Sequence, residues 1–155
     1  MLYEWTLGDD NLKAHDTILR ARYAETDQMG IIYHPNYYIY FEIGRTEYLR
    51  EAAGISYKEM EELGIMLPLT ETHCKYRIPA KYDDELLVRT SIKEMTVARI
   101  AFLYKLIRTS DGETLAEGET VHAFTNRSGR PINMKKRFSN LYNTLYELIN
   151  HKEEG

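Results

Sequence analysis

Asp27 is placed where a carboxylate can do chemistry, in the polar segment 25–30 (ETDQMG), which is typical of a turn. The dipeptide His34-Pro35 follows, and Pro35 suits the first turn of a helix because its missing N–H would have had no partner there. A carboxylate just before a helix N-terminus lies near backbone N–H groups that lack intrahelical partners. This geometry suits acyl transfer, with the N–H groups stabilising a developing negative oxygen and the carboxylate acting as nucleophile or general base.

These residues also have structural explanations. Asp27 taken alone is explained best as a turn residue that bonds its own backbone, and only the full spacing from Asp27 to Asn36 favours catalysis. The side chain of His34 has two equally good explanations, capping of the helix and catalysis. Tyr33 and Tyr37 near the helix start can serve both the core and a substrate pocket. The rest of the aromatic stripe is more typical of a core: Tyr40, Phe41 and Tyr48.

The strands that must support this site are predicted by alternating apolar residues. One strand is predicted over about 16–23, and others from about residue 85 onward. Asp111-Gly112 is a hairpin turn between two such runs, and a further strand is predicted over about 113–125. Strands that follow one another through short turns favour a mostly antiparallel sheet.

Helical spacing predicts a long helix from near Pro35 to about residue 53, where Gly54 ends it. A short helix follows Ser56, whose spacing to Glu59 is that of a capping box, and it ends at Gly64. A closing amphipathic helix is predicted by apolar residues in the tail, namely Phe138, Leu141, Leu145 and Leu148. The whole pattern predicts an α+β fold in a single domain, residues 1–155.

Composition excludes several classes of function. The net charge of -4 gives no electrostatic reason to bind a nucleic-acid backbone. The N-terminus lacks the basic start and apolar run of a signal peptide, and no apolar stretch is long enough to insert in a membrane. The single cysteine, Cys74, excludes an internal disulfide and favours a cytoplasmic location. Cys74 alternates with Thr72 and Tyr76 along a predicted strand, so we expect it to be a buried structural thiol. The five histidines show no ligand spacing, so no metal site is expected.

The segment 22–50 resembles the active-site segment of the 4-hydroxybenzoyl-CoA thioesterase family of the hotdog superfamily, especially the branch of bacterial acyl-CoA thioesterases associated with the Tol-Pal system. The matching pattern is Asp27-x-x-Gly30, an apolar pair, Tyr33, and 34–37 (HPNY) opening a helix that carries 44–47 (GRTE). Segments 82–84 and 118–124 also match. The resemblance implies a hotdog fold, an antiparallel sheet wrapped around one long central helix, and hydrolysis of acyl-CoA without cofactor or metal.

The resemblance also implies roles for two residues. Asp27 is the catalytic carboxylate, and the backbone N–H of His34 binds the thioester carbonyl, while a role for the imidazole stays open. Glu42 and Glu47 could include a second acid, but with Asp27 present they are interpreted as helix-face or salt-bridge residues. The expected substrate-binding residues near the helix start are Tyr33, Asn36 and Tyr37.

Coenzyme A is polyanionic, so an acidic protein that binds it needs basic side chains at the pocket mouth. The candidates, which we call the basic cluster, are Arg99, Lys135 and Lys136, with Arg127, Arg130 and Arg137. Each is also explained as an ordinary solvated charge, and the run 135–137 as the start of the last helix. The resemblance further implies a homodimer or homotetramer with sites at the subunit boundary. Two alternatives stay open, an acyl-acyl-carrier-protein thioesterase and a non-catalytic acyl-thioester binder.

Overall fold

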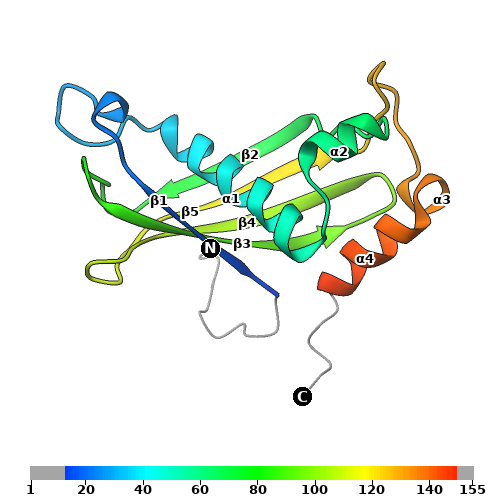
Figure 1. Ribbon diagram of the computed structural model, residues 1–155. Coiled ribbons are helices and arrows are strands. Elements are labelled where there is room, and N and C mark those ends of the chain that lie inside the picture. The colour runs from blue at the N-terminus through cyan, green and yellow to red at the C-terminus, as the bar shows by residue number, and fades with distance from the viewer. Residues whose placement is uncertain (1–12, 150–155) are drawn as a thin grey trace.

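A five-stranded antiparallel sheet curves around one long helix in the computed structural model, which describes residues 13–149 (Figure 1). The strand order is β1-β3-β4-β5-β2, so β1 and β2 form the edges. The strands are β1 (His15–Arg20), β2 (Leu69–Tyr76), β3 (Glu85–Met95), β4 (Arg99–Arg108) and β5 (Thr114–Ala123). This is the α+β arrangement that the sequence predicts.

The concave face of the sheet is built from alternating residues of the strands, as the strand pattern from about residue 85 onward predicts. In β3 and β4 these side chains are almost completely buried: Leu86, Val88, Thr90, Ile92, Ile100, Phe102, Tyr104 and Leu106. β4 is buried along most of its length because it is the central strand. The core therefore lies between this face and the long helix.

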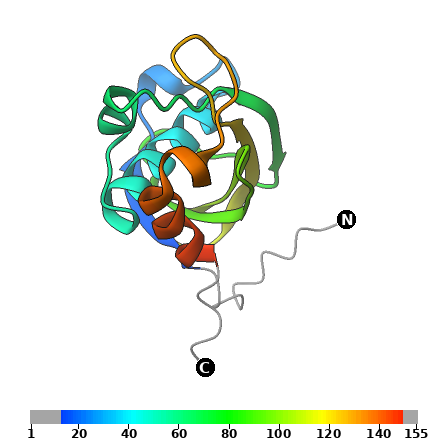
Figure 2. The same cartoon turned by 90° about the vertical axis from the view of Figure 1, so that its right-hand side faces the viewer.

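The long helix α1 (Asn36–Ala52) lies across the concave face, as Figures 1 and 2 show from two sides. Its buried residues include Tyr40, Phe41 and Tyr48, so the aromatic stripe is core as expected. Gly44 allows the close approach, because a Cβ there would lie 2.5 Å from a methyl group of Val88.

Three shorter helices and one 3-10 turn complete the described chain: η1 (Tyr23–Glu25), α2 (Tyr57–Glu62), α3 (Met134–Arg137) and α4 (Ser139–Ile149). The predicted capping box at α2 is confirmed, since Ser56 Oγ accepts the Glu59 N–H at 3.0 Å and Glu59 Oε1 accepts the Ser56 N–H at 2.8 Å. α4 packs on α3 and β3 at the end of the molecule seen in Figure 2. No helix within residues 13–149 is long and apolar enough to cross a membrane.

The structure corrects four local predictions. The first strand ends at Arg20 rather than at about residue 23, because the side chain of Glu25 bonds back to Arg22 and turns the chain into η1. β5 ends at Ala123 rather than at about residue 125, where Thr125 forms only isolated bridges. The run 135–137 belongs to the separate helix α3 instead of starting the last helix. Cys74 is half-buried rather than buried, because it lies on the edge strand β2.

Candidate active site

Asp27 lies in a tight turn that its own side chain stabilises. Its backbone N–H donates to the Ile31 carbonyl at 2.8 Å, and the Gly30 N–H donates to the Asp27 carbonyl at 3.0 Å. Oδ1 of Asp27 accepts the N–H of Met29 at 2.8 Å and that of Ile31 at 3.4 Å. No residue in the range 13–149 donates a hydrogen bond to Oδ2. The turn therefore holds the carboxylate by one oxygen and leaves the other available for chemistry.

The start of α1 provides one free N–H beside this turn. The Tyr33 N–H donates to the Glu25 carbonyl at 2.8 Å and the Asn36 N–H donates to the Tyr33 carbonyl at 2.9 Å, while Pro35 has no N–H. Within the described residues the N–H of His34 has no acceptor. The predicted oxyanion donor is thus the single available N–H of the segment 33–36.

The His34 side chain does not cap α1. Its imidazole makes no hydrogen bond with any residue from 13 to 149, and it packs edge-on against the rings of Tyr33 and Tyr76, with centroids 5.0 and 6.2 Å away. The His34 carbonyl accepts from the Tyr37 N–H and from the Tyr76 hydroxyl. These contacts fix the residue that carries the free N–H.

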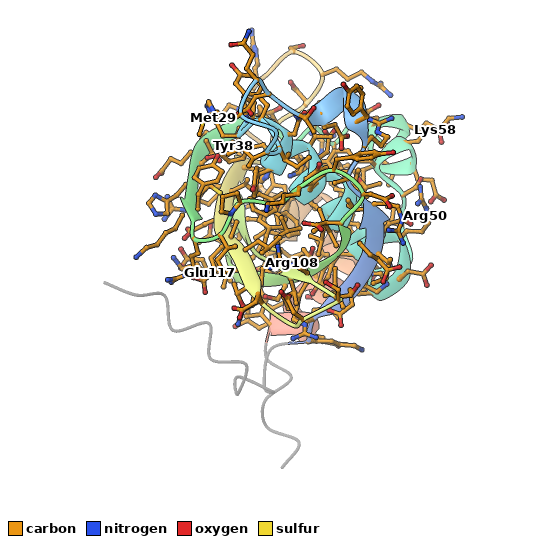
Figure 3. All side chains as sticks on the ribbon, turned by 90° about the vertical axis from the view of Figure 1, so that its left-hand side faces the viewer. Met29, Tyr38, Arg50, Lys58, Arg108 and Glu117 are labelled. Atoms are coloured by element: carbon orange, nitrogen blue, oxygen red, sulfur yellow. The ribbon has the colours of Figure 1, made fainter. Side chains whose placement is uncertain are left out.

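Asp27 and His34 line the same cleft, which has a volume of about 270 Å³. Figure 3 looks onto this end of the molecule, with Met29 marked on the Asp27 turn and Tyr38 on α1. The cleft walls are mainly apolar and aromatic: Ile31, Ile32, Tyr37, Tyr76, Arg77, Ile78 and Pro79. A carboxylate, a free N–H and an apolar wall are the parts that hydrolysis of an acyl group requires.

The other predicted substrate contacts divide into two kinds. Tyr37 lines the cleft, and its hydroxyl accepts the Ala80 N–H at 3.0 Å. Burial raises the pKa of Tyr37, so the hydroxyl is neutral. Asn36 Nδ2 instead donates to the Glu25 carbonyl at 2.9 Å, and Tyr33 is 51% exposed outside the cleft lining. Of these three residues, Tyr37 alone lines the cleft.

The residues of the basic cluster do not line the cleft. Lys135 and Lys136 lie on α3, which a hydrogen bond from the Met134 N–H to the Val97 carbonyl ties to the turn before Arg99. Figure 1 shows this region at the opposite end of α1 from the Asp27 turn. Arg127 has a structural partner, since its guanidinium donates to the carbonyls at the end of α2.

Sequence analysis missed the cleft wall formed by the end of β2 and the residues after it. Tyr76 and Arg77 reach the cleft because β2 pairs with β5, a long-range contact that no local pattern indicates. Arg77 also forms an ion pair with Glu117, with Nε and Oε2 2.6 Å apart. Burial raises the pKa of the nearby Cys74 thiol to about 11, so the thiol is protonated at neutral pH.

The sequence profile of the Thioesterase-like superfamily matches residues 21–141. A Bacillus subtilis protein, YneP, provisionally named as an acyl-CoA thioesterase, is 32% identical over 83% of this chain and 92% of its own length. An Arabidopsis thaliana chloroplastic acyl-acyl carrier protein thioesterase is 28% identical over 76% of this chain and 62% of its own. The crystal structure of a DHNA-CoA thioesterase from Staphylococcus aureus superposes with a TM-score of 0.82 at 30% identity, covering 87% of this chain and 90% of that one.

These similarities extend over most of the described chain and include both parts of the cleft, the Asp27 turn and the end of β2. They confirm the hotdog fold predicted from the sequence. The chain belongs to the Thioesterase-like superfamily.

Proposed function

We propose that this protein hydrolyses the thioester bond of acyl-CoA to a free acid and coenzyme A. The observation that carries the proposal is that Asp27, which has an unbonded carboxylate oxygen, and His34, which has a free N–H, line one cleft. The names of two relatives, the Bacillus subtilis and Staphylococcus aureus proteins, support a CoA thioester as the substrate class. The reaction needs water and these groups, and no cofactor or metal enters it.

In the proposed reaction the thioester carbonyl oxygen accepts the His34 N–H, which stabilises the oxyanion as it forms. Asp27 Oδ2 either attacks the carbonyl carbon or deprotonates a water that attacks it. The carbon–sulfur bond then breaks, and the thiolate of coenzyme A leaves and takes up a proton. If Asp27 is the nucleophile, water hydrolyses the acyl-aspartyl anhydride in a second step.

Within the superfamily we assign the chain to the 4-hydroxybenzoyl-CoA thioesterase family and its Tol-Pal-associated branch. The pattern from Asp27 to Glu47 supports this finer assignment. The single cysteine supports a cytoplasmic location, and the length supports one domain over residues 1–155.

A second copy of the chain is part of the proposal, as a homodimer or homotetramer. β2 is an exposed edge strand that contributes Tyr76 to the cleft, and an unpaired edge favours pairing with a second chain. Arg99, Lys135 and Lys136 lie away from the cleft of their own subunit, so they would meet the coenzyme A phosphates of a partner's site. Sedimentation that shows fully active monomers at micromolar concentration would contradict this assembly.

Acyl-acyl carrier protein is the second candidate substrate, because the Arabidopsis thaliana relative bears that activity in its name. Free-thiol release measured across a panel of acyl-CoA and acyl-carrier-protein substrates tests both candidates. We expect turnover of acyl-CoA, with catalytic efficiency at least tenfold above that for carrier-protein substrates. Higher catalytic efficiency with carrier-protein substrates would make acyl-acyl carrier protein the preferred substrate. Binding of substrates without thiol release from any of them would show that the protein is a non-catalytic acyl-thioester binder.

A further inference from the structure

Glu25 is a buried carboxylate two residues before Asp27 that does not line the cleft. It is only 7% exposed, and both oxygens of its carboxylate accept hydrogen bonds. Oε1 accepts the Arg22 N–H at 2.8 Å and the Tyr40 hydroxyl at 2.7 Å. Oε2 accepts from Nε and Nη2 of Arg22 at 3.1 and 3.0 Å.

The backbone of the same residue reaches the start of α1. The Glu25 carbonyl accepts the Tyr33 N–H at 2.8 Å and Asn36 Nδ2 at 2.9 Å. Together with the bond from Tyr40, three contacts therefore join Glu25 to the helix start and to α1 itself. Glu25 stands between the two halves of the site, because Asp27 follows it in the chain and His34 lies among the residues that bond to it.

The charge of Glu25 strengthens the hydrogen bonds that its carboxylate accepts from Arg22 and Tyr40. Burial alone would raise its pKa, but the hydrogen bonds from the Arg22 backbone, from Tyr40 and from the Arg22 guanidinium outweigh it and hold the pKa below its usual value. The carboxylate is therefore anionic at neutral pH, and hydrogen bonds to an anionic acceptor are shorter and stronger than neutral ones. A buried anion with four donors holds its neighbours in one arrangement.

We propose that Glu25 is a positioning residue for thioester hydrolysis, which fixes the Asp27 turn against the N-terminus of α1 without touching the substrate. This inference rests on the proposed function. A misplacement of about 1 Å between reacting groups costs on the order of 10²-fold in rate. A residue that keeps the Asp27 carboxylate and the His34 N–H at a fixed separation therefore supports the rate of hydrolysis.

Glu25→Gln keeps the size of the side chain but removes its charge and one acceptor. The amide oxygen still accepts the hydrogen bonds made by the one carboxylate oxygen that it replaces. In place of the other oxygen, the amide NH2 faces the Arg22 guanidinium or the Tyr40 hydroxyl, so two donors meet there. Since part of the network survives, we expect kcat to fall about tenfold or more with KM changed less than about threefold. Tyr40→Phe should lower kcat in the same direction by a smaller factor.

The matched control is Glu59→Gln. Glu59 accepts a backbone N–H from three residues upstream at 2.8 Å, as Glu25 does, but it is exposed on α2 and does not line the cleft. This variant should keep the wild-type kcat. Circular dichroism and thermal unfolding of all variants show whether the fold is intact.

A double-mutant cycle separates positioning from a general effect on folding. When Asp27→Asn has removed the carboxylate that is being positioned, Glu25→Gln should lower the residual single-turnover rate by less than about threefold. An equal loss in both backgrounds would show a merely structural role and overturn the inference. Wild-type kcat in both Glu25→Gln and Tyr40→Phe would also overturn it, while the proposed function would stand. No thiol release by the wild-type protein would instead refute the proposed function.

Discussion

Lowering the pH from about 7.5 to about 5 should destabilise this protein, because His122 is held neutral in a buried chain of hydrogen bonds. Arg45 donates to the Tyr104 oxygen at 3.1 Å, the Tyr104 and Thr120 hydroxyls lie 2.6 Å apart, and Thr120 Oγ1 lies 2.9 Å from His122 Nε2. His122 Nδ1 lies 3.0 Å from the Leu67 carbonyl. The carbonyl can only accept, so Nδ1 carries the proton and Nε2 accepts from Thr120.

The size of the effect follows from the pKa of His122. Burial, and after it the charge of Arg45, lowers this pKa from 6.5 to about 4. The unfolded chain binds the proton more readily, so the stabilisation is fully present above pH 6.5 and is lost as the pH falls toward the folded pKa. Proton linkage at one such site gives a loss of about 2 kcal/mol in the free energy of unfolding between pH 7.5 and 5.

Urea unfolding at both pH values, on the wild-type protein and on His122→Gln, measures this loss. Gln cannot titrate, while every other ionisable group is common to both proteins. We expect the variant to be less stable at pH 7.5 but to lose about 2 kcal/mol less than the wild type on acidification. The same loss in both proteins, within about 0.5 kcal/mol, would refute the neutral, buried state of His122.

Three further predictions concern the helix start, the packing of α1 and the basic cluster. His34→Ala should lower kcat less than about tenfold, because the variant keeps the backbone N–H that binds the oxyanion. Gly118→Ala should lower the free energy of unfolding by about 1–3 kcal/mol in urea, because the new Cβ would lie 2.8 Å from Cζ of Phe41. Neutralising Lys135 and Lys136 together should weaken binding of free coenzyme A, and the loss should shrink as salt is added, since exposed phosphate pairs are screened.

Each of these predictions has a contradicting result. A His34→Ala variant with no activity would give the imidazole a part in the reaction. An unchanged urea midpoint for Gly118→Ala would show that the ring of Phe41 can move aside. Binding of coenzyme A that is indifferent both to salt and to the two lysines would remove the electrostatic role of Lys135 and Lys136.

The sequence predicts the local elements around the candidate site, where the contacts are short-range. The turn at Asp27 and the helix that begins after Pro35 are encoded within about ten residues, by turn composition, proline preference and aromatic spacing. The free N–H of His34 lies in the same segment, but it precedes the N-cap Pro35, so it is the family resemblance rather than the helix geometry that singles it out. The core faces of β3 and β4 follow from simple alternation.

Other parts of the site depend on long-range pairing that no local pattern contains. Tyr76 and Arg77 reach the cleft only because β2 pairs with β5, at the opposite edge of the sheet from β1. Glu25 was missed because a turn glutamate is usually solvated, and its burial depends on Tyr40 from the facing helix. The basic cluster is predicted from charge alone, and charge does not tell which end of the molecule a residue occupies.

Asp27→Asn tests the central claim most directly. The change keeps the size of the side chain and the acceptor for the Met29 N–H, but removes the negative charge. Asp111→Asn is the matched control, since Asp111 also accepts the N–H two residues ahead, at 3.0 Å, in a turn outside the cleft lining.

Steady-state kcat and the affinity for acyl-CoA should be measured for both variants. We expect kcat of Asp27→Asn to fall by at least about 10²-fold with affinity within a few-fold of wild type, and Asp111→Asn to keep the wild-type rate. Hydrolysis by Asp27→Asn within a few-fold of the wild-type rate, with Glu47→Gln or His34→Ala inactive, would show that the carboxylate assignment is wrong.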